Sequence, residues 1–127
     1  MDTSVKHLDR KFLSNYYMEM ANDAQEIFEI FLSEMPNEIQ FISELLTENK
    51  INEAGERIHK ITPSFLSIGL PQLSIKLQTV EVFINYSNLS TAKSLMRLFI
   101  TELNEYLPAI QAELERLVAH HCSKTSV

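Results

Sequence analysis

The sequence predicts an all-α protein, an antiparallel four-helix bundle with an additional short N-terminal helix, and three observations favour this fold class. Apolar residues recur at the three- and four-residue spacing of amphipathic helices along almost the whole chain. No segment shows the clean two-residue alternation of a half-buried strand. Only two glycines and four prolines interrupt the chain, too few for the many tight turns of an all-β protein. Four substantial helices with short connections are typical of a bundle.

Length and apolar content predict a single domain. The chain has 127 residues, of which 45 % are hydrophobic, so it is long enough and apolar enough to bury a core of its own. We expect residues 1–127 to form one domain with a core over about residues 8–119. Such a domain needs no partner to fold, and we expect a monomer.

The first two helices follow from apolar spacing and one capping residue. A short helix is expected over residues 8–20. Asn22 is a good N-cap for the second helix, which should run to a turn at residues 48–50. Pro36 lies inside this helix, and since the apolar pattern resumes at once, we expect it to bend the helix rather than end it.

Glycine and proline mark the next two helices. The third helix is expected from about residue 51 to 68, where Gly69 supplies a C-terminal stop. Pro71 fits the first turn of a fourth helix over about residues 71–86.

The last helix is predicted to be long. Ser90 can cap it, and its apolar residues extend to Leu117. Pro108 lies inside it and is a candidate kink. Residues 123–127 are expected to be frayed.

Composition argues against several classes of protein. The net charge is −6, whereas general nucleic-acid binding needs a basic surface. A single cysteine, Cys122, cannot form a disulfide framework. No apolar run reaches the ~18 residues of a membrane span, and the first ten residues are too polar for a signal peptide. We therefore expect a soluble, cytoplasmic protein.

The charges are unevenly distributed along the chain. Residues 19–56 contain ten acids and one base, whereas residues 57–80 contain three bases and no acid. These bases are Arg57, Lys60 and Lys76. Such a positive segment attracts an anion or an acidic partner, although chance could also produce it in a short chain.

The third helix carries the candidate reactive residue, His59. At about 100° per residue, the apolar residues of this helix fall on one stripe about 80° wide, and His59 lies roughly 140° from its centre. Gly55 and Pro63 lie one turn before and after it, and both residue types are costly inside a helix. Small neighbours make sense if a large partner must reach the imidazole, a good nucleophile near neutral pH. The alternative is an ordinary surface histidine.

The segment from His59 to Gly69 resembles the signature of histidine-containing phosphotransfer (HPt) domains. The match holds at the histidine, at the small residue five positions on and at the aliphatic–glycine pair that closes the helix: His59, Ile61, Ser64, Ile68 and Gly69. Val80-Glu81 is similar to the apolar–acidic pair of the family's next helix. The resemblance covers about residues 8–117.

The resemblance implies a phosphorelay intermediate. Such a domain accepts a phosphoryl group on its histidine, here His59, from an aspartate of a receiver domain and passes it to another receiver. It has no kinase or ATPase activity and needs no cofactor, because Mg²⁺ belongs to the receiver. Glu81 would accept a hydrogen bond from Nδ1–H of His59, or would be a solvated surface acid. Receiver domains and a hybrid sensor histidine kinase are the implied partners.

Two positions depart from the family pattern. Thr62 replaces a lysine and Pro63 replaces a glycine. The candidates for stabilising the phosphoryl group are therefore Thr62, through one neutral hydrogen bond, and Lys60, which projects about 100° from His59. The candidates for docking a receiver are Gly55, Arg57, Pro63, Leu66 and Lys76.

Two alternatives to phosphotransfer remain open. One is an adaptor of the same fold that binds receivers without accepting phosphate. The other is a helical bundle whose acidic face holds an unrelated partner.

His120-His121-Cys122 is the one sequence cluster of metal-ligand types. Adjacent histidines on a helix point about 100° apart, and a structural zinc site needs four converging ligands. We therefore expect no metal site.

Overall fold

The computed structural model describes residues 6–20 and 23–125, with the side chains of 18–20 and 121–125 left aside. All regular secondary structure in these ranges is helical, which confirms the predicted all-α class. The helices are α1 (Arg10–Met20), α2 (Ala24–Thr47), α3 (Ile51–Ser67), α4 (Pro71–Asn85) and α5 (Leu89–Thr125). No helix within the described ranges is long and apolar enough to cross a membrane.

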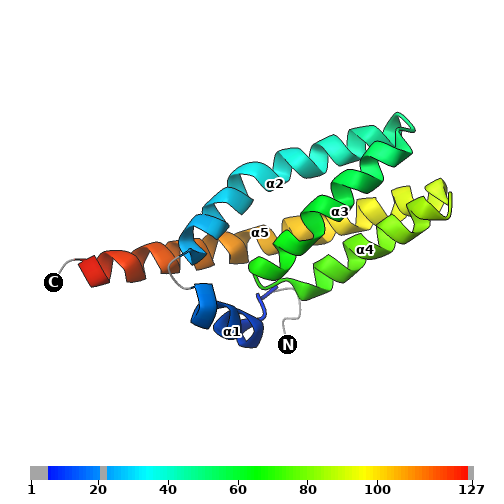
Figure 1. Ribbon diagram of the computed structural model, residues 1–127. Coiled ribbons are helices and arrows are strands. Elements are labelled where there is room, and N and C mark those ends of the chain that lie inside the picture. Colours follow the sequence, from blue (N-terminus) through cyan, green and yellow to red (C-terminus); the bar gives the residue numbers. More distant parts are fainter. Residues whose placement is uncertain (1–5, 21–22, 126–127) are drawn as a thin grey trace.

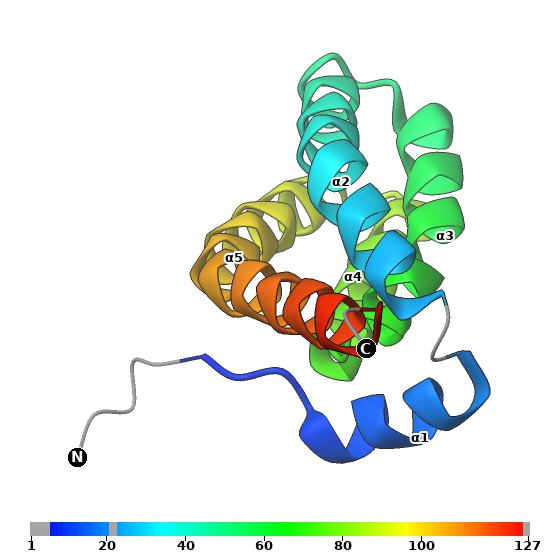
Figure 2. The same cartoon turned by 90° about the vertical axis from the view of Figure 1, so that its left-hand side faces the viewer.

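The long helices pack in a ring around one core. α2 packs on α3, α3 on α4, α4 on α5, and α5 back on α2, and Figure 1 shows these helices running side by side. Seen from one end, α1 lies outside this ring (Figure 2). The predicted helical bundle with a short additional N-terminal helix is confirmed at this level.

Three helices end in the same way, and each ending leads into a short connection. Asn49, Gly69 and Ser87 have positive φ angles of 61°, 79° and 60° after α2, α3 and α4 respectively. In each case the next amide donates to the carbonyl five residues earlier, as in a Schellman motif: Lys50 to Leu45, Leu70 to Phe65 and Asn88 to Phe83. The stop predicted at Gly69 is confirmed.

Two of the predicted boundaries need correction. The α5 cap is Asn88 and not Ser90, because Asn88 Oδ1 accepts a hydrogen bond from the Thr91 amide at 3.3 Å and the helix begins at Leu89. α5 continues to Thr125, so residues 123–125 are helical where fraying was expected, while residues 126–127 lie outside the described residues. The predicted cap of α2, Asn22, lies outside the described residues.

Aromatic residues connect α3 to α2 beside it and to α5 across the core. Phe65 of α3 meets Phe31 of α2 edge to face, with ring centroids 5.3 Å apart. It meets Phe99 of α5 in the same manner at 5.4 Å. All three rings are buried, so the core face of α3 is fixed from two sides.

α1 is held by an apolar contact and by a buried carboxylate. Leu13 packs on Gly69 so closely that a Cβ added there would lie 2.6 Å from the leucine side chain. Glu113 of α5 is 1 % exposed. Its oxygens accept hydrogen bonds from Arg10 Nη1 at 2.7 Å, from Tyr17 Oη at 2.6 Å and from Arg116 at 2.9 and 2.8 Å.

These hydrogen bonds determine the ionisation of Glu113. Burial by itself raises the pKa of its carboxyl group. The hydrogen bonds from Arg116, Tyr17 and Arg10 outweigh burial and lower the pKa from 4.5 to about 2. The pKa of the Tyr17 hydroxyl is raised, by burial and by its hydrogen bond to Glu113. The anchor of α1 is therefore an ionised carboxylate held by neutral and cationic donors.

Candidate functional site

His59 stands on the outer side of α3. Its side chain is 81 % exposed, whereas Ile58, the residue before it, is fully buried. The helical wheel predicts this contrast, because consecutive residues on a helix point about 100° apart. The ring is accessible to a large partner.

Glu81 of α4 lies beside the inner nitrogen of the imidazole. Its two oxygens are 3.2 and 3.4 Å from Nδ1 of His59, and its side chain is largely buried at 22 % exposed. A carboxylate here favours the tautomer with hydrogen on Nδ1 and leaves the lone pair on Nε2. Among the described residues, Nε2 has no hydrogen-bond partner.

Close packing of α3 and α4 brings the two residues together. Gly55 is buried, and a Cβ added to it would lie 3.5 Å from Ile84 of α4. One turn beyond His59, Ser74 donates a hydrogen bond to the Thr62 carbonyl at 3.3 Å. A Cβ at this distance would make an ordinary contact, so the packing of α4 does not by itself require a glycine at this position. Gly55 also lines the depression beside His59, and its expected role in docking a partner stays a prediction.

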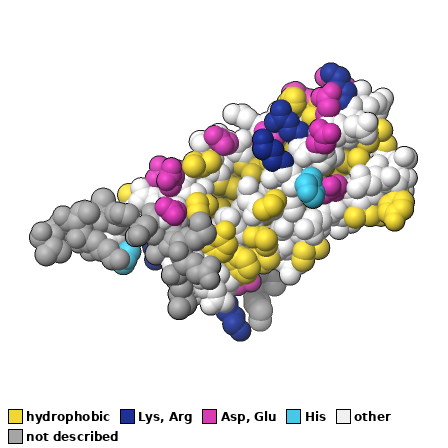
Figure 3. Space-filling view, viewed as in Figure 1, with side chains coloured by type: hydrophobic (Ala, Val, Ile, Leu, Met, Phe, Trp, Pro, Cys, Tyr) yellow, Lys and Arg dark blue, Asp and Glu magenta, His cyan; other side chains and the backbone are white. Residues whose placement is uncertain are grey.

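The surface beside His59 is shallow and open. A depression of about 710 Å³ lies at the α3–α4 junction and is lined by His59, Glu81 and Asn52, among others. Figure 3 shows a histidine standing on this face next to an acidic side chain, with basic side chains nearby. Within the described part of the chain, the imidazole is accessible to an approaching protein.

Thr62 does not offer a donor to this surface, contrary to expectation. Its side chain is 5 % exposed, and its hydroxyl donates to the Ile58 carbonyl at 2.7 Å. The reason is its position on the side of α3 that α4 covers. A threonine there satisfies its hydroxyl within its own helix.

Pro63 is exposed one turn after His59. Proline has no N–H to donate to the carbonyl oxygen four residues earlier, which is that of His59. α3 nevertheless continues to Ser67. The usual backbone hydrogen bond from residue 63 to the His59 carbonyl is therefore absent beside the imidazole.

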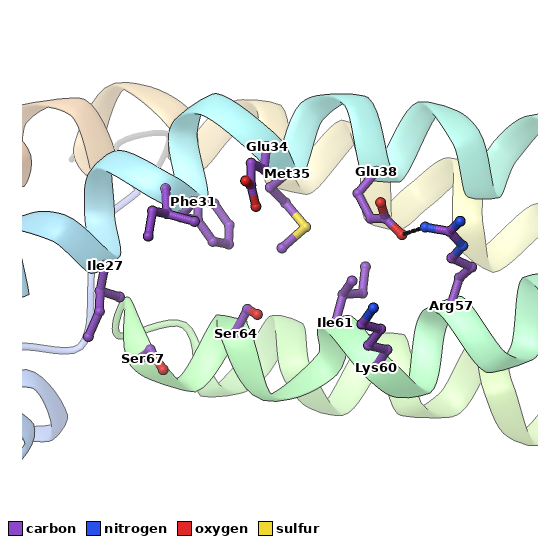
Figure 4. A pocket seen from close by; sticks show the side chains of 11 residues that line it. Ile27, Phe31, Glu34, Met35, Glu38, Arg57, Lys60, Ile61, Ser64 and Ser67 are labelled. Atoms are coloured by element: carbon purple, nitrogen blue, oxygen red, sulfur yellow. Dashed lines mark hydrogen bonds and ion pairs between the residues drawn. The ribbon is translucent and has the colours of Figure 1, made fainter.

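Arg57 and Lys60 lie on the other flank of α3, facing α2. Arg57 donates to Glu38 of α2 at 2.9 Å and covers the ring of Phe41 at 4.7 Å. Lys60 lines a groove of about 430 Å³ between α2 and α3 (Figure 4). Lys60 therefore lies on the α2 side of α3, whereas His59 contacts α4. It does not stand beside the imidazole as a phosphoryl-stabilising residue would.

Lys76 is likewise engaged elsewhere. It forms an ion pair with Glu102 of α5, because it lies five residues, or about 140° of rotation, from Glu81 on α4. Its expected role in docking a partner over His59 is not supported by this position. Leu66 is half-buried and remains a candidate contact.

The acids that pair with two of the three bases of the positive segment were not predicted from the sequence. Glu38 and Glu102 take up Arg57 and Lys76 respectively. Each acid directly precedes a core residue, Ile39 and Leu103 respectively, which places it at the edge of a helix contact. The facing pairs depend on how the helices pack, and the sequence contains no local signal for that.

The predicted absence of a metal site stays a prediction. His120 is exposed, while His121 and Cys122 are among the residues whose side chains are not described. Elsewhere in the described ranges, no group of three or more histidine, cysteine, aspartate or glutamate side chains could hold a metal ion.

Comparison of the chain with protein-family models, with curated proteins and with solved structures gives no match. The resemblance to HPt domains thus depends on the motif residues around His59 and on Glu81.

Proposed function

We propose that this protein is a cytoplasmic phosphorelay intermediate of the HPt type, an antiparallel four-helix bundle that carries a phosphoryl group on His59. One observation carries the proposal. An exposed imidazole has its inner nitrogen next to a carboxylate and its outer nitrogen free. A nucleophile oriented by a third group is the arrangement that covalent catalysis requires.

The transfer is a displacement at phosphorus. The Nε2 lone pair of His59 forms a bond to the phosphorus of an aspartyl phosphate as the bond to the aspartate oxygen breaks, and the aspartate leaves as a carboxylate. The hydrogen stays on Nδ1, and Glu81 stabilises the positive ring. Mg²⁺ on the receiver balances the phosphoryl charge. Attack by a second receiver's aspartate on the phosphohistidine reverses these bond changes.

The surroundings of His59 set the lifetime of the phosphorylated state. Thr62 stands where the family has a lysine, and its hydroxyl is taken up by Ile58. A charge-assisted hydrogen bond to the phosphoryl oxygens is therefore missing. We expect a phosphohistidine that is less stable than one with a neighbouring lysine.

The test is phosphate transfer from receivers. The full chain is mixed with a panel of receiver domains from the same organism, each charged with labelled acetyl phosphate and Mg²⁺. We expect label that is lost in acid and stable in alkali, absent from His59→Gln and retained by His120→Gln, a matched change at another exposed histidine. Label that persists in His59→Gln, or no label from any receiver, refutes the proposal.

The buried Thr62 hydroxyl favours one second candidate, an adaptor that binds receivers without accepting phosphate. This adaptor predicts receiver binding that survives His59→Gln while the wild-type chain never becomes labelled.

A further inference from the structure

The groove between α2 and α3 is a second candidate site, on the opposite flank of α3 from Glu81. Its volume of about 430 Å³ falls within the range of about 300–1,000 Å³ that is usual for ligand sites. The floor of the groove is apolar and is formed by Ile27, Ile30, Phe31, Met35 and Ile61. Of these, Phe31, Met35 and Ile61 are at most 8 % exposed, so the packed core fixes the shape of the floor.

Contacts between helices bound the groove at both ends. At one end, Arg57 of α3 donates to Glu38 of α2 at 2.9 Å, and the two charges neutralise each other. At the other end, Ser67 of α3 is hydrogen-bonded to Tyr16 of α1 at 2.9 Å. Figure 4 shows Ser67 and the Arg57–Glu38 pair at opposite ends of the groove. The stretch of α3 between them is about 15 Å long, which suits a small molecule.

Glu34 and Lys60 carry opposite charges on opposite walls of the groove. Both line it and are exposed, and neither forms an ion pair with another described residue. Figure 4 shows Glu34 facing Ser64 across the groove, and Lys60 precedes Ser64 by one turn of α3, which is about 6 Å along the helix axis. The carboxylate and the ammonium group therefore complement a ligand that carries both charges.

We propose that this groove binds a free apolar α-amino acid. The ammonium group of the ligand donates to the Glu34 carboxylate, Lys60 donates to the ligand's carboxylate, and the apolar side chain lies on the floor beside Met35. Charge-assisted hydrogen bonds are about 2.8 Å long. Two of them, joined by a head group whose charges are attached to one carbon atom, bridge the gap between Glu34 and Lys60. This inference does not depend on the proposed function, because His59 lies outside the groove.

Charge and size together narrow the ligand. An apolar acid without an ammonium group would bring its carboxylate towards Glu34, and an apolar amine would bring its charge towards Lys60. Such juxtaposition of like charges disfavours binding. At roughly 30 Å³ for each water molecule, the volume of about 430 Å³ holds about fourteen of them, which is close to the dozen or so non-hydrogen atoms of phenylalanine. For a ligand of this size in an open groove, we expect a Kd of about 1 mM.

The experiment titrates the isotope-labelled full chain with three ligands that share an aromatic ring. Phenylalanine has both charges, phenylpropionate lacks the ammonium group and phenylethylamine lacks the carboxylate. Backbone amide chemical shifts in NMR spectra locate the site and give each Kd. We expect phenylalanine to shift the amides of groove residues such as Phe31 and Ile61, and each analogue to bind about fivefold more weakly, as loss of one charge-assisted hydrogen bond predicts.

Two variants each remove one charge from the groove. Glu34→Gln should weaken phenylalanine binding about fivefold and abolish the preference for phenylalanine over phenylpropionate. Lys60→Gln should weaken binding by the same factor and abolish the preference over phenylethylamine. The matched controls are Glu44→Gln on α2 and Lys11→Gln on α1, which are exposed and lie outside the groove. We expect the controls to change the Kd by less than about twofold. Circular dichroism verifies that each variant is folded.

Several outcomes would overturn the inference. Phenylalanine causes no shifts at concentrations up to about ten times the expected Kd, or the shifted amides lie away from the groove. Either analogue binds as tightly as phenylalanine, which would make the groove a general apolar surface. A folded Glu34→Gln or Lys60→Gln variant binds phenylalanine as wild type does, which would show that the charge in question does not contact the ligand.

Discussion

Replacing Glu113 by glutamine removes the buried negative charge that joins α1 to α5 and keeps the side-chain size. The carboxylate receives four hydrogen bonds from Arg10, Tyr17 and Arg116. These lower its pKa from 4.5 to about 2. At 1.36 kcal/mol per pKa unit, this difference corresponds to about 3 kcal/mol in favour of the ionised folded state. Breaking a buried pair by removing one partner costs a similar amount, about 3–5 kcal/mol.

The cost of Glu113→Gln depends on pH in a defined direction. Because the pKa of Glu113 is lower in the folded state, its contribution is fully present above pH 4.5 and is lost as the pH falls towards about 2. We therefore expect a loss of about 3 kcal/mol in the free energy of unfolding at pH 7, and a much smaller loss at pH 2.5, where the wild-type carboxyl is partly protonated.

Urea unfolding followed by circular dichroism at both pH values measures this loss. Glu115→Gln is the matched control, because Glu115 is exposed on the same helix and accepts only a 3.5 Å hydrogen bond from Gln111. If both variants lose the same free energy at pH 7, or if the cost of Glu113→Gln is equal at the two pH values, the buried ionised carboxylate does not hold α1.

Three further substitutions test other parts of the structure. Glu81→Gln should slow phosphotransfer to His59 about tenfold in rapid-quench measurements, since an amide stabilises the positive ring less well; an unchanged rate would assign Glu81 to the solvated surface. Gly69→Ala should lower the free energy of unfolding by about 2 kcal/mol or more, because the residue has positive φ and contacts Leu13; an unchanged urea midpoint would contradict this. Pro63→Ala should raise the free energy of unfolding by about 2 kcal/mol by restoring an N–H donor to α3, and no increase in Tm would show that the proline is tolerated without cost.

Helix boundaries were predictable where a single residue decides the local backbone. Gly69 ends α3 and Pro71 begins α4, because each residue type has one strong preference at such positions. The start of α5 was less predictable, since several residues there can cap a helix. Ser87 adopts the left-handed conformation that ends α4, which leaves Asn88, and not Ser90, directly before the first helical residue.

The accessibility of His59 follows from helical periodicity, but the residues around it depend on packing between helices. Thr62 lies only about 60° from His59 on the wheel, yet the approach of α4 buries it. Arg57 and Lys76 are cations in the sequence and pair with Glu38 and Glu102, which are distant along the chain. Which helix faces meet depends on packing. The sequence therefore suggested that Arg57 and Lys76 were free to contact a partner, whereas both are paired within the fold.

The aromatic contacts of Phe65 determine the direction in which His59 points. The ring of Phe65 meets Phe31 of α2 and Phe99 of α5 edge to face, and each such pair is worth about 0.5–1.5 kcal/mol beyond its buried area. If α3 turned about its long axis, both contacts would break together. Phe65, six residues after His59, therefore prevents α3 from rotating about its axis. The imidazole keeps its outward direction when a partner protein binds against the helix.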